Sequence, residues 1–184
     1  MSDAPLSASP SPLAAVAVFE TFRLLCIETG GDFETSLAAA ALRGLEPFSA
    51  PMPPRPDVVS REALAQLRQP GYFFTVSRYL TGGNGRPLRR MTESSVVARP
   101  ASFEDVSAVL TRALGAPTVT VRGRRVEFVY LTDPGGPALP SRADGWRRLE
   151  RGEGELVEVA AWDVREHQDR PGDAVSLSYL RWTL

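Results

Sequence analysis

The chain has 184 residues, of which 21 are lysine or arginine and 22 are aspartate or glutamate, so its formal net charge is −1. Every one of the 21 is an arginine, and a chain without lysine cannot use a Schiff-base lysine or a phosphate-binding P-loop lysine. The single cysteine, Cys26, permits neither an internal disulfide nor a CxxC motif, and the single histidine, His167, excludes a two-histidine metal helix. We therefore expect no metal and no cofactor.

Charge and hydropathy also bear on partners and location. A net charge near zero gives no general attraction to nucleic acid or to an anionic membrane. No basic residue precedes Arg23, and the apolar run at 13–19 is too short for a secretory signal or a membrane span. With 43% hydrophobic and 23% charged residues, the composition is that of a globular protein. We expect a single soluble, cytoplasmic domain over residues 12–184, preceded by a disordered tail over residues 1–11.

The N-terminal part of this domain predicts a helical hairpin over residues 12–45. Ser11 followed by Pro12 is an N-cap and first-turn signal, and apolar residues then recur at helical spacing as far as Gly30 and Gly31. Asp32 is a suitable cap for a second helix over 33–43, which Gly44 would end. The apolar positions of the first helix are Ala15, Val18, Phe19, Phe22, Leu25 and Cys26.

Residues 46–57 are expected to be an extended connector and residues 60–68 a short helix. The five prolines at 47, 51, 53, 54 and 56 exclude regular helix or a central strand from the connector. Ser60 stands at a suitable N-cap position, and the Pro70–Gly71 pair would end the helix that follows it.

Residues 72–184 predict a sheet-rich part. Ser102 and Asp105 stand at capping-box spacing before a helix at 103–114, and a helical turn is expected at 146–151. Short turns join most of the strands, so the sequence predicts an α+β fold, with an N-terminal helical hairpin plus an antiparallel β-sheet with one further well-capped helix. Aromatic and β-branched residues mark the expected strands at 72–80, 88–98, 118–121, 126–131, 155–164 and 174–184.

Arginine clusters are the candidate binding residues. One cluster follows the glycine-rich loop at 81–85, and another lies in the Arg-Gly-Arg-Arg turn at 122–125. Their guanidinium groups could hold phosphate or carboxylate if the strands bring the two clusters together. Aromatic residues at 72–74 could then help to grip a single nucleic-acid strand. The alternative is a plain Asn-Gly hairpin turn with solvated arginines around it. The candidate anion-binding residues are Arg86, Arg89, Arg90, Arg122, Arg124 and Arg125, and a third cluster comprises Arg147, Arg148 and Arg151.

No catalytic residue is assigned from the sequence, because no nucleophile motif occurs. If the protein were an enzyme, Glu93, Asp163 or His167 would have to transfer the proton, since arginine stays protonated. His167 lies in a polar, acidic turn, where an ordinary exposed histidine is the alternative to a metal ligand or general base. Cys26 lies on the apolar face of the first helix and is expected to be a core residue.

The segment Phe19-x-x-Phe22-x-x-Leu25-Cys26-x-x-Thr29-Gly30-Gly31-Asp32 resembles a group of small, uncharacterised bacterial proteins that share this helix, cysteine and Gly-Gly-Asp junction. Some of these proteins have a second cysteine where this chain has Ser94 and Ser95, so a redox pair is not available here. The resemblance implies a bacterial protein and supplies neither an activity nor a site.

Three functional hypotheses follow from the sequence. The first is a non-enzymatic binding or regulatory domain that acts through a protein partner or as a homo-oligomer, with a sheet edge at 174–184 and the apolar helical hairpin as contact surfaces. The second is a protein or enzyme that binds a small anion, phosphate or carboxylate, in an arginine clamp of Arg86, Arg89 and Arg90. The third is nucleic-acid binding, which the net charge and the lack of an RNP-type consensus disfavour.

Overall fold

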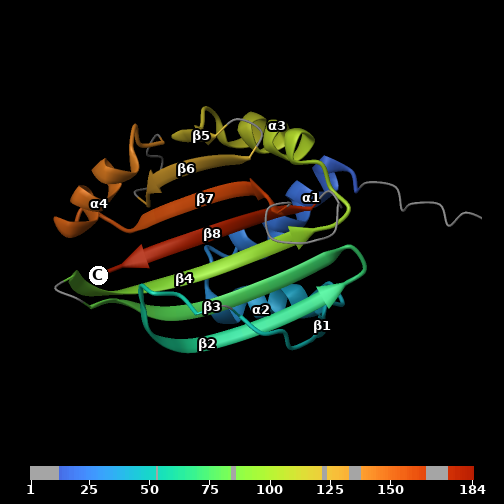
Figure 1. Ribbon diagram of the computed structural model, residues 1–184, viewed down its shortest axis with the longest axis horizontal. Coiled ribbons are helices and arrows are strands. Elements are labelled where there is room, and N and C mark those ends of the chain that lie inside the picture. The colour runs from blue at the N-terminus through green and yellow to red at the C-terminus, as the bar shows by residue number, and fades with distance from the viewer. Residues whose placement is uncertain (1–12, 53, 84–85, 122–123, 133–137, 165–173) are drawn as a thin grey trace, which may run out of the picture.

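The computed structural model describes residues 13–52, 54–83, 86–121, 124–132, 138–164 and 174–184 (Figure 1). The expected tail at 1–11, with Ser11 and Pro12 of the first helix signal, lies outside these residues. The helices are α1 (Ala15–Phe22), which continues as a π-helical turn (Arg23–Ile27), α2 (Phe33–Leu42), α3 (Phe103–Leu114) and α4 (Arg142–Glu150). The strands are β1 (Glu46–Pro47), β2 (Val58–Gln69), β3 (Tyr72–Gly83), β4 (Arg86–Ala98), β5 (Val119–Val121), β6 (Arg125–Leu131), β7 (Leu156–Asp163) and β8 (Val175–Thr183).

The strands form one antiparallel sheet in the order β1-β2-β3-β4-β8-β7-β6-β5. The first four strands and the last four each follow one another along the chain, and the pairing of β4 with β8 joins the two halves. This arrangement confirms the predicted α+β fold with an antiparallel sheet, and the N-terminal helices α1 and α2 agree with the predicted helical hairpin.

The predicted helix at 60–68 is wrong, because these residues belong to the long strand β2. Pro70 and Gly71 do not end a helix but form the turn of a β-hairpin, in which Gly71 adopts a φ of +82°. Leu67 of β2 lies opposite Phe74 of β3, and both side chains are buried in the core. Burial against a neighbouring strand outweighs the helix signal of an isolated N-cap residue.

The expected sheet edge at 174–184 is also wrong. Strand β8 lies in the middle of the sheet, between β4 and β7 (Figure 1). Its side chains are buried on both faces from Val175 to Tyr179, as suits a central strand that alternates serine with apolar residues. The C-terminal strand therefore has no free backbone edge to offer a partner, and the ends of the sheet are β1 and β5.

The helical hairpin covers one face of the sheet and buries its main apolar side there, while Val16 and Leu42 remain exposed on its outer side. Val18, Phe22 and Cys26 have no exposed area, and they pack in one core cluster with Phe74, Val96, Leu177 and other residues of the sheet. Helix α3 joins this core through Val106 and Leu110. As expected, Cys26 is a core residue, and burial raises the pKa of its thiol to about 12. Figure 1 shows α1 and α2 behind the sheet.

A smaller core lies on the opposite face of the sheet, under helix α4. Trp182, Leu156 and Met91 face this side, because they alternate along their strands with residues of the larger core. Helix α4 can approach closely because Gly145 has no side chain: a Cβ there would lie 2.5 Å from Leu156 Cδ1. Leu149 of the same helix is buried in this core.

Side-chain caps begin three of the helices. Asp32 accepts a hydrogen bond from the Thr35 amide (2.9 Å), and Ser102 accepts one from the Asp105 amide (3.3 Å), so both predicted caps are confirmed. Ser141 caps α4 in the same way (3.1 Å). No helix in the described parts of the chain is long and apolar enough to cross a membrane.

We predict that Gly31→Ala costs about 2–4 kcal/mol of the free energy of unfolding, from a positive φ and a steric clash. Gly31 has a φ of +66°, and a Cβ there would lie 2.7 Å from the Tyr179 ring, which is 7% exposed. Gly44→Ala is the matched control, because Gly44 has a φ of +75° but nothing within 4 Å of a Cβ, so its loss should be about 1 kcal/mol. Urea unfolding of the two variants measures the difference, and equal losses would contradict the contact with Tyr179.

Candidate functional site

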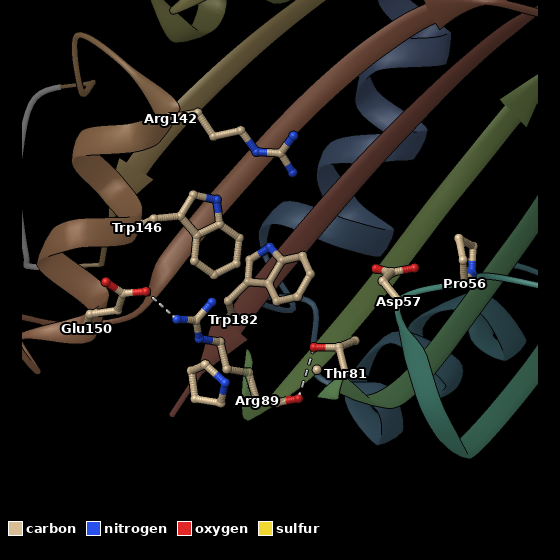
Figure 2. Close-up of a pocket in the computed structure, with 10 residues that line it drawn as sticks. Pro56, Asp57, Thr81, Arg89, Arg142, Trp146, Glu150 and Trp182 are labelled. Carbon is tan, nitrogen blue, oxygen red and sulfur yellow. Dashed lines mark hydrogen bonds and ion pairs between the residues drawn. The ribbon is translucent and has the colours of Figure 1, made fainter. Parts of the chain in front are cut away.

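A cavity of about 760 Å³ opens on the face of the sheet that carries α4. It lies where four parts of the chain meet: the residues just before β2, the β3–β4 hairpin, helix α4 and the end of β8 (Figure 2). Beside its wall, Tyr79, Met91, Trp182 and Leu156 lie in one row across four neighbouring strands. The elements that form the cavity therefore belong to distant parts of the sequence.

Two tryptophans form the centre of the site. Trp146 of α4 packs edge to face on Trp182 of β8, with ring centroids 4.9 Å apart and an angle of 68° between the planes. Trp182 is only 6% exposed, and its indole Nε1 is buried without a hydrogen-bond partner in the described structure. A buried N–H group without an acceptor is costly, so this donor requires an explanation.

Two arginines flank the tryptophan pair, one on each side in Figure 2. Arg89 lies over the ring of Trp146, 4.7 Å from its centroid, and donates to Glu150 at 2.6 Å. Arg142, the first residue of α4, donates through Nε to Oε1 of Glu158 at 2.8 Å. In the described residues the Nη groups of Arg142 make no hydrogen bond, so they remain able to donate.

The opposite wall of the cavity carries an acidic group. The Gly82 amide donates to the backbone carbonyl of Asp57 at 3.1 Å, which fixes the connector against the β3–β4 hairpin. Arg55 lies 5.4 Å from the ring centroid of Tyr79 and pairs with two carboxylates. It makes a close hydrogen-bonded contact with Glu93 and a longer ion pair, 3.7 Å, with Asp57.

Glu158 is a buried carboxylate and Glu93 a partly buried one on the same face of the sheet. Burial is the main cause that raises the pKa of Glu93, while the neighbouring Arg55 lowers it. The pKa of Glu158 is raised in the same way by burial, against the lowering effect of Arg142. Each of these two carboxylates is held by one arginine from a flanking segment, and the ion pairs fasten the connector and α4 to the sheet.

The candidate anion-binding arginines do not gather in one place. Arg89 lines the cavity, whereas Arg90, the next residue of β4, points to the other side and pairs with Glu62 at 3.3 Å. Arg125 makes a close contact with Glu127 and lies opposite Trp162, near the end of the sheet remote from Arg89. Arg124 lies in the turn before it. The side chain of Arg86 and the whole of Arg122 lie outside the described residues.

The aromatic residues proposed to accompany these clusters are also separated. Tyr72 and Phe74 are buried in the core beneath the helices, and only Phe73 is exposed on the opposite face. Phe73 and Arg125 lie in one cross-strand row, but strands β4, β8 and β7 stand between them. The structure therefore places no continuous aromatic and basic surface along the described part of this row.

The glycine-rich loop at 81–85 joins β3 to β4. The two strands pair antiparallel on either side of it, as a hairpin turn requires, and residues 84–85 themselves lie outside the described residues. Asp163 ends β7, and His167 lies outside the described residues. Among the described residues no group of three or more His, Cys, Asp or Glu is arranged to hold a metal ion.

Sequence reasoning missed most of this site. Arg142 and Trp146 were not singled out as binding residues: the helical turn expected at 146–151 includes Trp146, whereas Arg142 was expected in a Pro/Gly-rich loop at 133–145 and in fact begins α4. The usable signal was Ser141, which caps a helix and thereby fixes Arg142 and Trp146 four residues apart, on one face of that helix. No sequence pattern marked Asp57 as a site residue, because its place in the cavity wall depends on where the connector crosses the sheet.

Comparison with protein-family models, with curated proteins and with solved structures finds no match to this chain.

We predict that Glu93→Gln flattens the pH dependence of stability above about pH 4.5, the ordinary pKa of a glutamate. Because the folded state raises the pKa of Glu93, the folded protein binds this proton more tightly than the unfolded chain does. The resulting stabilisation is complete below the unfolded pKa and is lost as the pH rises through the folded one. The free energy of unfolding, measured with urea across this range, should therefore decrease less with pH in the variant.

Glu153→Gln is the control for this measurement. Hydrogen bonds from Arg151 and Arg148 lower the pKa of Glu153, so this residue titrates below the chosen range and the variant should keep the wild-type slope. Identical slopes for Glu93→Gln and the wild-type protein would contradict the buried state of Glu93.

Proposed function

We propose that this protein is a non-enzymatic binding domain whose cavity holds a small ligand through an anionic group, preferably a carboxylate. The observation that supports this proposal is the unpaired, buried N–H of Trp182 in the wall of a cavity that Arg142 also lines. In Figure 2 the Trp182 nitrogen is turned to the side on which Arg142 lies. Because the Trp182 Nε1 atom has no exposed area in the described structure, an oxygen acceptor would receive hydrogen bonds from both groups by entering between them with a shift of the indole.

The energetics of burial favour a ligand at this position. The indole N–H has lost its water on folding and has gained no protein acceptor in the described structure, which costs about 1–3 kcal/mol. A bound carboxylate would recover this loss, and it would also accept a charge-assisted hydrogen bond from Arg142. The flat indole rings and the nearby Pro56 and Pro87 supply apolar walls for the remainder of the ligand.

The lining groups are suited to binding and release. Arg89 and Arg142 stay protonated at physiological pH and can hold an anion, but they cannot accept a proton from it. Glu150 is engaged by Arg89, and Glu158 is engaged by Arg142. These pairs hold the arginines in fixed positions before a ligand arrives, which lowers the entropy cost of binding.

This proposal keeps the arginine-based anion binding of the second sequence hypothesis but changes its residues. Arg89 remains, Arg142 and Trp182 join it, and Arg86 and Arg90 are not part of the proposed site. The first sequence hypothesis, in which the protein acts through a protein partner or as a homo-oligomer, remains a prediction. Of the two surfaces suggested for it, strand β8 is central in the sheet and the main apolar side of the helical hairpin is buried against the sheet.

We predict that Arg142→Ala weakens the binding of a small carboxylate about ten- to hundred-fold, because one charge-assisted hydrogen bond is lost. Trp182→Phe keeps an aromatic ring and removes the N–H, and it should weaken binding about five-fold. Isothermal titration calorimetry with acetate, hexanoate, phenylacetate and inorganic phosphate measures these affinities, and thermal unfolding shows that each variant is folded.

Arg151→Ala is the matched control, because Arg151 follows the same helix but is exposed and pairs with Glu153 away from the cavity. Its affinity should equal that of the wild-type protein. If none of the four probes binds the wild-type protein, or if folded Arg142→Ala binds them as well as Arg151→Ala does, the proposed function is wrong.

A further inference from the structure

The two walls of the cavity differ in the charge that they offer to a ligand. Arg142 lies on the α4 side of the cavity, and Asp57 lies on the far side of Trp182 from α4 (Figure 2). Arg89 and Glu150, which also line the cavity, are paired with each other. Apart from this pair, the α4 side offers the hydrogen-bond donors of Arg142, and the opposite wall offers the carboxylate of Asp57.

Asp57 is less well neutralised than the other acidic groups around the cavity. One arginine, Arg55, serves both Asp57 and Glu93, so this group of three side chains has a net charge of −1 when both acids are ionised. Arg55 is hydrogen-bonded to Glu93, whereas its 3.7 Å contact with Asp57 is too long for a hydrogen bond. The Asp57 carboxylate therefore retains the capacity to bind a second cation.

The tryptophan pair lies between the two charged walls. In Figure 2 the indole of Trp182 lies between Trp146 and Asp57, so a ligand that reaches from Asp57 to the α4 side crosses this indole. Aromatic rings of this kind offer an apolar surface to the part of a ligand between its charged ends. The face of Trp146 is already occupied by the guanidinium of Arg89.

We propose that the ligand is a linear zwitterion, with its ammonium group at Asp57 and its carboxylate between Arg142 and the N–H of Trp182. This inference rests on the proposed function and names the class of ligand for the same site. Because the two subsites are on opposite walls of a cavity of about 760 Å³, the ligand's charges are separated by several carbon atoms, unlike those of an α-amino acid. The intervening methylene groups pack on the indole rings.

Three probes that share a five-carbon chain test the inference: 6-aminohexanoate carries both charges, hexanoate carries only the carboxylate, and pentylamine carries only the ammonium. Isothermal titration calorimetry on the wild-type protein should show 6-aminohexanoate binding about ten-fold more tightly than hexanoate, because it gains an ion pair with Asp57. Glycine, whose charges are close together, should bind no more tightly than acetate.

Asp57→Asn should remove the ten-fold advantage of 6-aminohexanoate and leave the affinity for hexanoate unchanged within about two-fold. The variant should fold, because the Asp57 side chain is 43% exposed and it is the backbone carbonyl that Gly82 binds. Asp105→Asn, at an exposed position in the first turn of α3, is the control and should behave as the wild-type protein does.

The outcomes separate this inference from the proposed function. If hexanoate binds in an Arg142-dependent way but 6-aminohexanoate gains nothing, or if Asp57→Asn leaves its advantage intact, the zwitterion is wrong and the carboxylate site stands. If pentylamine binds while neither hexanoate nor 6-aminohexanoate does, the anion site itself is wrong, and the zwitterion fails with it.

Discussion

The pairing of β4 with β8 is the constraint on which the rest of the structure depends. It joins two four-stranded halves, in each of which neighbouring strands are also consecutive along the chain. Nine residue pairs, from Arg90–Thr183 to Ala98–Val175, form this contact. The pairing also sets the register that brings Trp182 opposite Met91, beside the β3–β4 hairpin.

The two faces of this sheet have different roles. One face is covered by α1, α2 and α3 and forms the main apolar core, in which Cys26 is an inert side chain. On the other face two glutamates are each held by an arginine from a flanking segment: the partly buried Glu93 by Arg55, and the buried Glu158 by Arg142. Buried ion pairs of this kind add little net stability but specify which segments meet. Here they position the connector and α4 on either side of the cavity.

Local patterns predicted much of the fold but little of the site. The helix caps at Asp32 and Ser102 and the six later strands follow from residue types within a few positions of each other. The strand β2 could not be recognised in this way, because its identity depends on β3 and not on its own residues. The site could not be predicted from the sequence for a similar reason. Arginines close in the sequence, such as Arg89 and Arg90, point to opposite faces of one strand, whereas Arg89 and Arg142, far apart in the sequence, line the same cavity.

The sequence by itself determined the available chemistry: arginine as the only permanent cation, one thiol, one imidazole, and local signals for helices, turns and strands. The tertiary structure alone decided which of these groups meet. The reason is physical. Capping and strand propensity act over a few residues, whereas the cavity depends on strand order, on the side of the sheet to which each residue points, and on a missing side chain at Gly145 that lets α4 approach. Those contacts join residues separated by more than a hundred positions, and only the folded sheet fixes them.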